Sequence, residues 1–317
     1  MRRVYRSRRA EVVALDGVDL AVRQGELYGV LGPNGAGKTT LIKILVTLLL
    51  PSSGTALVDG LDVVREFGRL RHRIAMVSGG ENVGYGMLTV REQLWMFSQL
   101  YGIDSGRAYR RIDELLVRVG LADAARRRVH ELSSGMRQKM NLVRGLMTDP
   151  RILFLDEPTV ALDVGAARDV RREVRRWMAE DPTRTVILTT HYMMEADELC
   201  DRLAIVNRGR IVAEGTPSAL KREVRHDTVI DLRLSQGPLL LDAMRGVAGV
   251  AAASVYEQDG SDRFSILLAD DDVLPRVLAL VHESGRAVQS ITKREPTLED
   301  AFVSLVGRGM AEEESRG

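Results

Sequence analysis

The octapeptide GPNGAGKT, residues 32–39, constrains this chain more than any other stretch. It fits the pattern G-x-x-x-x-G-K-[ST], and it lies between the apolar run LYGVL (27–31) and the run TTLIKILVTLLL (39–50). These runs predict a strand before the loop and a helix after it, ended by Pro51. In that order, backbone N–H groups at a helix N-terminus can wrap phosphate oxygens. A glycine-rich turn elsewhere is usually only a turn, but the full pattern here predicts a phosphate-binding loop, called the P-loop below.

Each residue type in the P-loop suits contact with phosphate. Glycines 32, 35 and 37 leave room for the backbone to approach the oxygens. Lys38 is expected to reach the β and γ phosphates of a nucleotide, and Thr39 to hold Mg²⁺. The predicted nucleotide-binding residues here are Gly32, Pro33, Asn34, Gly35, Ala36, Gly37, Lys38, Thr39 and Thr40.

Four further apolar runs predict strands of the same sheet. They are RIAMV (73–77), RILFLD (151–156), TVILTT (185–190) and LAIVN (203–207), and they alternate with helical stretches. This alternation predicts an α/β fold with a parallel sheet covered on both faces.

Two acidic residues and a histidine follow these strands. Asp156 ends a buried run, so its carboxylate is expected at the carboxyl end of the sheet, where it is placed to hold Mg²⁺. Glu157 is the candidate general base for an attacking water. An Asp-Glu pair is often plain surface, but after a P-loop it predicts a catalytic pair. His191 is expected to contact the γ-phosphate or the water, although a lone histidine there is more often structural.

The region from 84 to 147 is predicted to be a helical subdomain. Thr89 and Glu92 form a capping box, and apolar residues repeat at helical spacing at Ile112, Leu115, Leu116 and Val119. The region ends in ELSSGMRQKM (131–140), where Ser133 is expected to cap a helix over 136–147.

A second domain is predicted over 220–308, after a first domain of residues 1–219. Strands are expected at 230–234, 250–256, 263–268 and 290–294, and helices at 239–246 and 273–285. A turn at Asp259-Gly260 would join the middle strands. The order β-α-β-β-α-β is typical of a small ferredoxin-like α+β domain. Residues 309–317 are acidic and polar, and are expected to form a disordered tail.

Composition excludes several function classes. The net charge of +1 argues against a nucleic-acid partner. Cys200 is the only cysteine, so an intramolecular disulfide is excluded and a cytoplasmic location is favoured. Since no window approaches the ~18 apolar residues that span a bilayer, any membrane crossing would belong to another chain.

The motifs GPNGAGKT, SSGMRQ, ILFLDEPT, ALDV and His191, in this order, resemble the nucleotide-binding subunit of an ABC transporter. The match covers roughly residues 10–217, and the closing PTLEDAFVSLVGR resembles the accessory domain of ABC-2 type drug and antibiotic exporters. The resemblance implies a P-loop NTPase of ABC type that hydrolyses ATP with Mg²⁺, with Lys38, Glu157 and His191 as catalytic residues and Thr39 and Asp156 as metal ligands.

The resemblance also implies partners. Two ATPase subunits would pair head to tail, so that Ser133 and Gly135 contact the γ-phosphate held by the other subunit's P-loop, and Asp163 links the two sites. The complete hydrolytic set favours two copies of this chain. A separate transmembrane permease would hold the dimer at the inner face of the cell membrane, and the transported substrate is left open.

The sequence departs from the family pattern in the signature, where Ser134 and Met136 replace the usual glycine and glutamine as in ABC-2 type exporters, and at two further positions. The glutamine expected after 73–77 is replaced within SGGENVGYG, where Glu81 is a candidate substitute acting through a water. The aromatic residue that stacks on adenine is either Tyr5 or replaced by Arg9, and Tyr5 is preferred. One alternative is a soluble ABC ATPase acting on nucleic acid or the ribosome, although no heptad run or internal repeat is present. Another is a low-turnover regulatory subunit.

Overall fold

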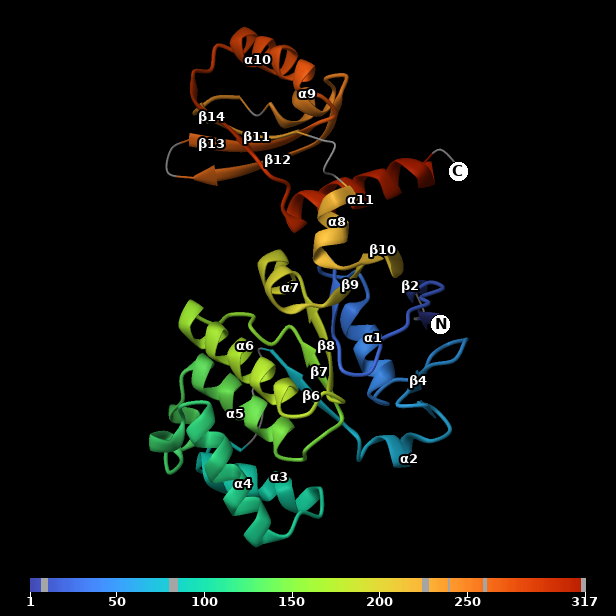
Figure 1. Cartoon of the computed structure of the whole chain (residues 1–317), viewed down its shortest axis with the longest axis vertical. Helices are drawn as coiled ribbons and strands as arrows, with labels where there is room; N and C mark the ends of the chain where they lie inside the picture. Colours follow the sequence, from blue (N-terminus) through green and yellow to red (C-terminus); the bar gives the residue numbers. More distant parts are fainter. Residues whose placement is uncertain (7–10, 80–84, 224–227, 239, 259–260, 315–317) are drawn as a thin grey trace. The chain divides into compact units, whose positions relative to one another are not determined.

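The computed structural model describes residues 1–317 except 7–10, 80–84, 224–227, 239, 259–260 and 315–317 (Figure 1). The chain divides into two compact units, residues 1–211 and 212–317. The division falls before the boundary predicted at residue 219.

A six-stranded sheet is formed mainly by unit 1, and its edge strand, residues 210–215, crosses the division between the units. Its strands are β3 (Leu27–Leu31), β6 (Ile74–Ser78), β7 (Ile152–Asp156), β8 (Thr185–Thr190), β9 (Arg202–Asn207) and β10 (Arg210–Gly215), in the order β10-β9-β3-β8-β7-β6. β3 pairs in parallel with β8 and β9, and β7 pairs in parallel with β6 and β8. The parallel sheet is confirmed for the five predicted strands, whose ends lie within one residue of those expected, and β10 was not predicted. The carboxyl ends of these five parallel strands therefore share one edge.

Helices cover both faces of this sheet (Figure 1). Phe154 of β7 packs in one apolar cluster with residues of α1 (Lys38–Leu45). Leu153, the residue before Phe154, faces the other way, toward α5 (Ser134–Leu146), against which α6 (Val164–Ala179) packs. At Gly145 of α5, an added Cβ would lie 2.6 Å from Val77, so this glycine lets the helix approach the sheet closely.

The helix after the P-loop is shorter than predicted. It ends at Leu45 rather than Leu50, and Thr47 has a φ of 65°, which is left-handed backbone. The N–H groups of residues 48 and 49 both bond to the carbonyl of Lys43 and close the turn. Leu48 and Leu50 stay 65% and 62% exposed, so burial does not favour a further helical turn here despite the apolar sequence.

The helical region contains α3 (Val90–Leu100) and α4 (Ser105–Arg118), which lead to α5 through two short 3₁₀ turns, Ala122–Ala124 and Val129–Glu131. The predicted capping box of Thr89 and Glu92 is confirmed, with Glu92 N–H donating to Thr89 Oγ1 at 3.2 Å. Arg118 of α4 ties this region to α6, since it lies 2.6 Å from Glu173 and 2.8 Å from Glu180.

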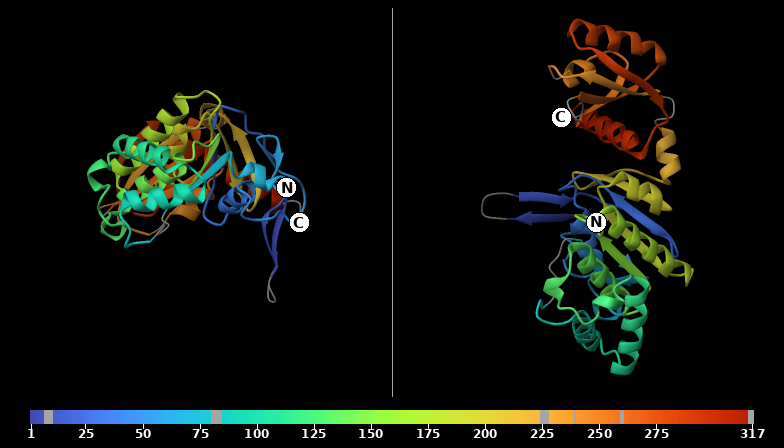
Figure 2. Two further views of the ribbon diagram at one scale, coloured as in Figure 1. Left: turned by 90° about the horizontal axis from the view of Figure 1, so that it is seen from below. Right: turned by 90° about the vertical axis from the view of Figure 1, so that its left-hand side faces the viewer.

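Short elements complete unit 1. β1 (Arg3–Arg6) and β2 (Glu11–Leu15) form a hairpin that projects from the unit (Figure 2). β4 (Leu57–Val58), β5 (Leu61–Asp62) and α2 (Phe67–Leu70) lie between α1 and β6 in sequence, and α7 (Met193–Leu199) follows β8. Of the helices in the described ranges, none has the length and apolar character required to cross a bilayer.

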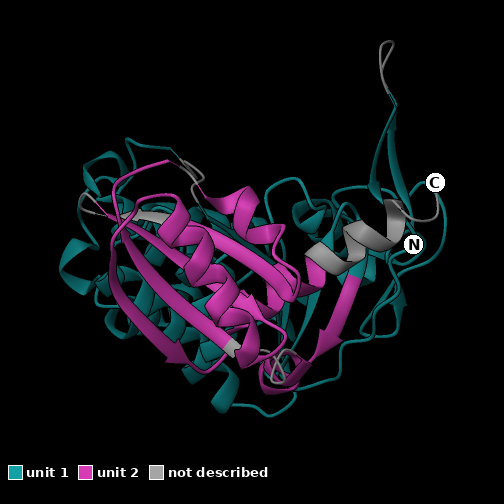
Figure 3. Cartoon of the chain, turned by 90° about the horizontal axis from the view of Figure 1, so that it is seen from above, with its two compact units in different colours: residues 1–211 teal, residues 212–317 magenta. Residues whose placement is uncertain are grey.

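Unit 2 is the predicted small α+β domain (Figure 3). After α8 (Pro217–Glu223) come β11 (Thr228–Ser235), α9 (Leu241–Arg245), β12 (Val250–Gln258), β13 (Ser261–Leu268), a 3₁₀ turn (Asp271–Val273), α10 (Leu274–Glu283), β14 (Val288–Arg294) and α11 (Leu298–Glu314). The sheet is antiparallel in the order β12-β13-β11-β14, which is the split β-α-β arrangement. The predicted β-α-β-β-α-β order is confirmed, and the expected turn at 259–260 lies outside the described residues.

Both faces of the second sheet are covered. Phe264 of β13 packs with residues of α9 and α10 on one face, and Leu267 packs with Ala301 of α11 on the other. α11 continues to Glu314, through most of the segment for which the sequence predicts a disordered tail. One alanine and three consecutive glutamates in that segment have high helix propensity.

Candidate functional site

The P-loop has the backbone geometry that its glycines predict. Gly35 and Gly37 have φ values of 80° and 105°, which other residues rarely adopt. An added Cβ at Gly32 would lie 2.3 Å from the Val206 carbonyl oxygen, and one at Gly37 would lie 2.4 Å from that of Ala14. The loop lines a cavity of about 180 Å³, whose described lining residues are Ala14, Asn34, Gly35, Ala36, Gly37, Lys38, Thr39, Thr40 and Glu157.

Lys38 is buried inside the loop, with 4% of its surface exposed. Its Nζ donates to the carbonyl oxygens of Gly32 (2.8 Å) and Pro33 (3.1 Å), and lies 3.2 Å from Glu157 Oε1. A buried ammonium needs such partners, because an unpaired charge is costly away from water. The lysine is therefore fixed at the cavity with its charge balanced by Glu157.

The two predicted metal ligands are neighbours in space. Thr39 Oγ1 donates to Asp156 Oδ1 at 3.1 Å, although the residues are 117 positions apart in sequence. A hydroxyl and a carboxylate are the hard oxygen ligands that suit Mg²⁺. Thr39 belongs to the P-loop and Asp156 lies at the end of β7. The two oxygen ligands therefore fit Mg²⁺.

Glu157 is held in a strained backbone conformation between two basic side chains. Its φ of 49° is left-handed, which is uncommon for a residue with a side chain. Its Oε2 lies 3.2 Å from Nδ1 of His191, and its Oε1 faces Lys38. Strain of this kind concentrates at functional sites. The fold thus brings together Lys38, Glu157 and His191, the three residues predicted to be catalytic.

Two further residues shape this site and were missed by the sequence reasoning. Thr189 of β8 lies opposite Asp156 in the parallel register and is fully buried. Gly79 donates its N–H to the Asp156 carbonyl at 2.8 Å, and a Cβ there would lie 1.8 Å from the Glu157 carbonyl oxygen. The two threonines directly before His191 were the available signal for Thr189.

Glu195 of α7, four residues after His191, is a buried carboxyl that was also missed. It is 2% exposed and accepts a hydrogen bond from Thr159 Oγ1 at 2.9 Å. Burial raises the pKa of Glu195 above its usual value, because removal from water disfavours the charged form. The bond joins α7 to the loop that follows Glu157.

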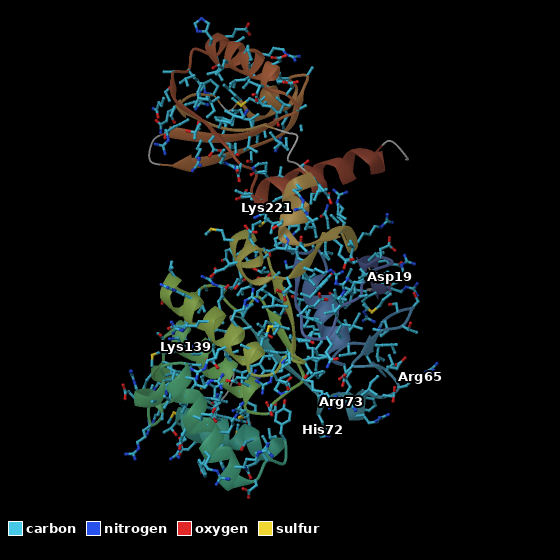
Figure 4. All side chains as sticks on the ribbon, in the orientation of Figure 1. Asp19, Arg65, His72, Arg73, Lys139 and Lys221 are labelled. Carbon is cyan, nitrogen blue, oxygen red and sulfur yellow. The ribbon has the colours of Figure 1, made fainter. Side chains whose placement is uncertain are left out.

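The residues predicted to act across a dimer lie at two helix N-termini. Ser133 caps α5, as predicted, by accepting the N–H of Met136 at 3.2 Å, and Asp163 caps α6. An added Cβ at Gly135 would lie 2.8 Å from Ala166, so this glycine allows close packing of α5 on α6. Lys139 of α5, labelled in Figure 4, adds an ion pair to Asp169 of α6 at 2.6 Å. Ser133, Gly135 and Asp163 are not among the described residues that line the P-loop cavity.

The hairpin places Tyr5 opposite Val12, where Tyr5 is 39% exposed and lies beneath the guanidinium of Arg3. Among the described residues, the hairpin contributes Ala14 but not Tyr5 to the lining of the P-loop cavity. Stacking of Tyr5 on adenine therefore stays a prediction. Arg9 and Glu81 lie outside the described residues.

Comparison with known proteins adds independent evidence. The ABC transporter family matches residues 15–160, and the C-terminal domain of DrrA1-3-like ATP-binding proteins matches residues 215–306. The daunorubicin resistance ATP-binding protein DrrA3 of Streptomyces coeruleorubidus is 39% identical over 299 residues, covering 93% of this chain and 91% of that protein. The Nod factor export ATP-binding protein I of Burkholderia orbicola is 35% identical over 303 residues, covering 96% and 95%.

Solved structures agree with these relatives. The dimeric post-hydrolysis cassette MJ0796 bound to ADP and Pi has a TM-score of 0.62 at 25% identity, covering 68% of this chain and 95% of that one. The protein cbiO1 of Clostridium perfringens, part of the ABC transporter complex cbiONQ, has a TM-score of 0.60 at 26% identity, covering 70% of this chain and 92% of that one.

Proposed function

Because the chain belongs to the family of ABC transporter ATP-binding subunits, and is an ATP-hydrolysing subunit of the exporter type, we propose that it uses Mg²⁺ with ATP and drives a separate transmembrane permease. The observation that supports this most strongly is a cavity lined by Lys38, Thr39 and Glu157, in which Glu157 also meets His191 and Thr39 also meets Asp156.

Each residue of the site has a role in this proposal. P-loop N–H groups and Lys38 bind the β and γ phosphates, and Thr39 and Asp156 hold Mg²⁺, which neutralises phosphate charge when bound. Glu157 takes a proton from the water that attacks the γ-phosphorus, and ADP leaves with the bridging oxygen. His191 orients Glu157 and contacts the γ-phosphate.

The arrangement of Lys38 suggests how ATP prepares the base. The ammonium of Lys38 lies 3.2 Å from Glu157 Oε1. Phosphate oxygens carry more charge and would replace Glu157 as the partner of Lys38. The carboxylate would then be free to accept a proton from water.

We further propose that two copies pair head to tail. Ser133 is exposed at the N-terminus of α5, where a hydroxyl, free N–H groups and the helix dipole suit a phosphate. Gly135 at this terminus and Asp163 on the neighbouring α6 complete the surface that would meet the other copy. The permease would hold this dimer at the cytoplasmic face of the membrane.

The variant Glu157→Gln tests the catalytic assignment. It should bind ATP, because the P-loop is intact, and accumulate as an ATP-bound dimer, while phosphate release falls by ~10² or more since the general base is lost. Light scattering after gel filtration measures the dimer, and a phosphate-release assay measures turnover. Wild-type turnover in this variant would exclude Glu157 as the base.

The same variant tests the partner. Tagged Glu157→Gln protein is captured from detergent-solubilised native membranes with MgATP, and bound proteins are identified by mass spectrometry. A polytopic protein without ATPase motifs of its own is expected. Recovery of ribosomal proteins or DNA-repair factors without a membrane protein would instead favour the soluble ABC ATPase alternative.

A further inference from the structure

The side chain of Thr189 lies between the two acidic residues of the site. It is fully buried in β8, in register with Asp156 of the neighbouring strand. Its Oγ1 donates to Asp156 Oδ1 at 2.5 Å and accepts the N–H of Glu157 at 3.2 Å. One hydroxyl therefore contacts both residues that the proposed function assigns to metal binding and to proton transfer.

The contact with Asp156 fixes the direction of its carboxylate. Asp156 Oδ1 accepts from two hydroxyls, those of Thr39 and Thr189. Thr39 belongs to the P-loop, and its oxygen would turn to the metal when the cation binds. Thr189 comes from the sheet and is not a predicted metal ligand. Its bond can therefore hold the Asp156 carboxylate whether or not Mg²⁺ is bound.

The contact with Glu157 supports a backbone that is otherwise unfavourable. Glu157 has a φ of 49°, and its N–H is shared between the carbonyl oxygen (3.0 Å) and the hydroxyl (3.2 Å) of Thr189. Such conformations persist only where surrounding contacts determine them. This conformation directs the Glu157 side chain toward Lys38 and His191.

We propose that Thr189 is a positioning residue for ATP hydrolysis, which orients the Asp156 carboxylate toward Mg²⁺ and holds Glu157 in its catalytic conformation. The inference rests on the proposed function of this site. Partners that orient a metal ligand typically contribute ~10- to 100-fold to metal affinity or activity. A loss of that size is therefore expected when the hydroxyl is removed.

The competing explanation is that Thr189 only satisfies buried hydrogen bonds in the sheet. The same strand offers a matched control in Thr185, which is 5% exposed and accepts the N–H of Gly25 at 2.9 Å at the opposite end of β8. Thr185→Val removes a buried hydroxyl from β8 without touching Asp156 or Glu157. Any effect of hydroxyl loss on folding alone is therefore present in both valine variants.

The experiment compares Thr189→Val, Thr189→Ser and Thr185→Val in the full chain. Binding of a fluorescent ATP analogue is measured with Mg²⁺ and with EDTA, alongside the Mg²⁺ dependence of phosphate release. In Thr189→Val we expect ~10-fold weaker binding with Mg²⁺, unchanged binding in EDTA, and kcat reduced ~10-fold or more. Thr189→Ser, which keeps the hydroxyl, and Thr185→Val should both stay close to wild type.

Equal effects of the two valine variants, or wild-type Mg²⁺ dependence in Thr189→Val, would overturn the inference. If Thr189→Val does not fold, as judged by circular dichroism, Thr189→Ala and Thr189→Ser give the same comparison. The wild-type chain distinguishes a failure of the proposed function from a failure of the role assigned to Thr189. Absence of Mg²⁺-dependent hydrolysis in wild type contradicts the proposed function, whereas normal wild-type hydrolysis with no effect at Thr189 contradicts this inference alone.

Discussion

At the scale of single residues, the segment that follows Glu157 is held by a buried side chain outside the P-loop cavity. Glu195 makes no contribution to the cavity lining, yet it joins α7, which follows His191, to Thr159 in the loop after Glu157. Its carboxyl is almost fully buried, so folding removes it from water. The pKa of Glu195 is raised by this burial, which links the stability of the domain to pH.

The variant Glu195→Gln should show this linkage. A folded pKa above the unfolded one means that stability is highest while Glu195 is protonated in both states, and falls as the pH rises through the folded pKa. Glutamine cannot ionise and avoids this loss. The free energy of unfolding of the variant relative to wild type should therefore increase as the pH rises above 4.5, the usual pKa of a glutamate, toward the raised pKa of the folded state. Chemical denaturation at each pH measures it, and a difference that does not change with pH would contradict the prediction.

At the scale of elements, two helix caps have the same structural role, and only one of them has a proposed role in ATP turnover. Ser133 caps α5 and Thr89 caps α3, each through a side-chain oxygen that accepts a backbone N–H. Both caps are readable from sequence, since capping depends on residues within one helical turn. The end of α1 was predicted wrongly, because it depends on whether Leu48 and Leu50 are buried by the rest of the fold, and both are exposed.

Alanine at these two caps should have similar effects on stability and different effects on turnover. Ser133→Ala and Thr89→Ala should each lower the free energy of unfolding by ~1 kcal/mol. If Ser133 also binds phosphate across a dimer, only Ser133→Ala should reduce ATP turnover, by ~10-fold for a lost hydrogen bond to a charged group. Denaturation and phosphate release measured on the same preparations check both parts. An equal loss of turnover in both variants would remove the functional role of Ser133.

At the scale of the whole molecule, each proposed site takes its P-loop from one copy and Ser133 from the other. Two chains with defects in different halves of the site can therefore form one intact site when they pair. This arrangement follows from the proposed head-to-tail pairing, because one copy has Ser133 outside the described lining of its own P-loop cavity.

A mixing experiment tests this pairing. Lys38→Ala loses its P-loop function, and Ser133→Arg places a bulky charge on the exposed N-terminus of α5, so each variant alone should be inactive. Mixed dimers would contain one intact site, and random mixing should restore about one quarter of wild-type turnover. The two variants are mixed in equal amounts and exchange subunits under native conditions, and phosphate release is then measured. No recovery in mixtures shown to contain mixed dimers would contradict sites shared between chains.

The sequence by itself determined the features that depend on neighbours along the chain. These were the P-loop, the caps of α3 and α5, the five parallel strands of the first sheet and the β-α-β-β-α-β order of unit 2. Asp156 and Glu157 could be assigned to the site because carboxyl ends of parallel strands share one edge. The positions of Lys38 and His191 followed from the same rule.

Only the tertiary structure decided which side chains touch across that edge. Thr189 is found beside Asp156 because β7 and β8 pair in one register, and a shift of one residue would turn its hydroxyl to the other face. The need for glycine at residue 79 arises from its contact with Glu157, far away in sequence. Local patterns specify elements through contacts within a few residues, whereas register and close approach are set by the packing of distant segments, so the geometry of this site could be known only from the folded chain.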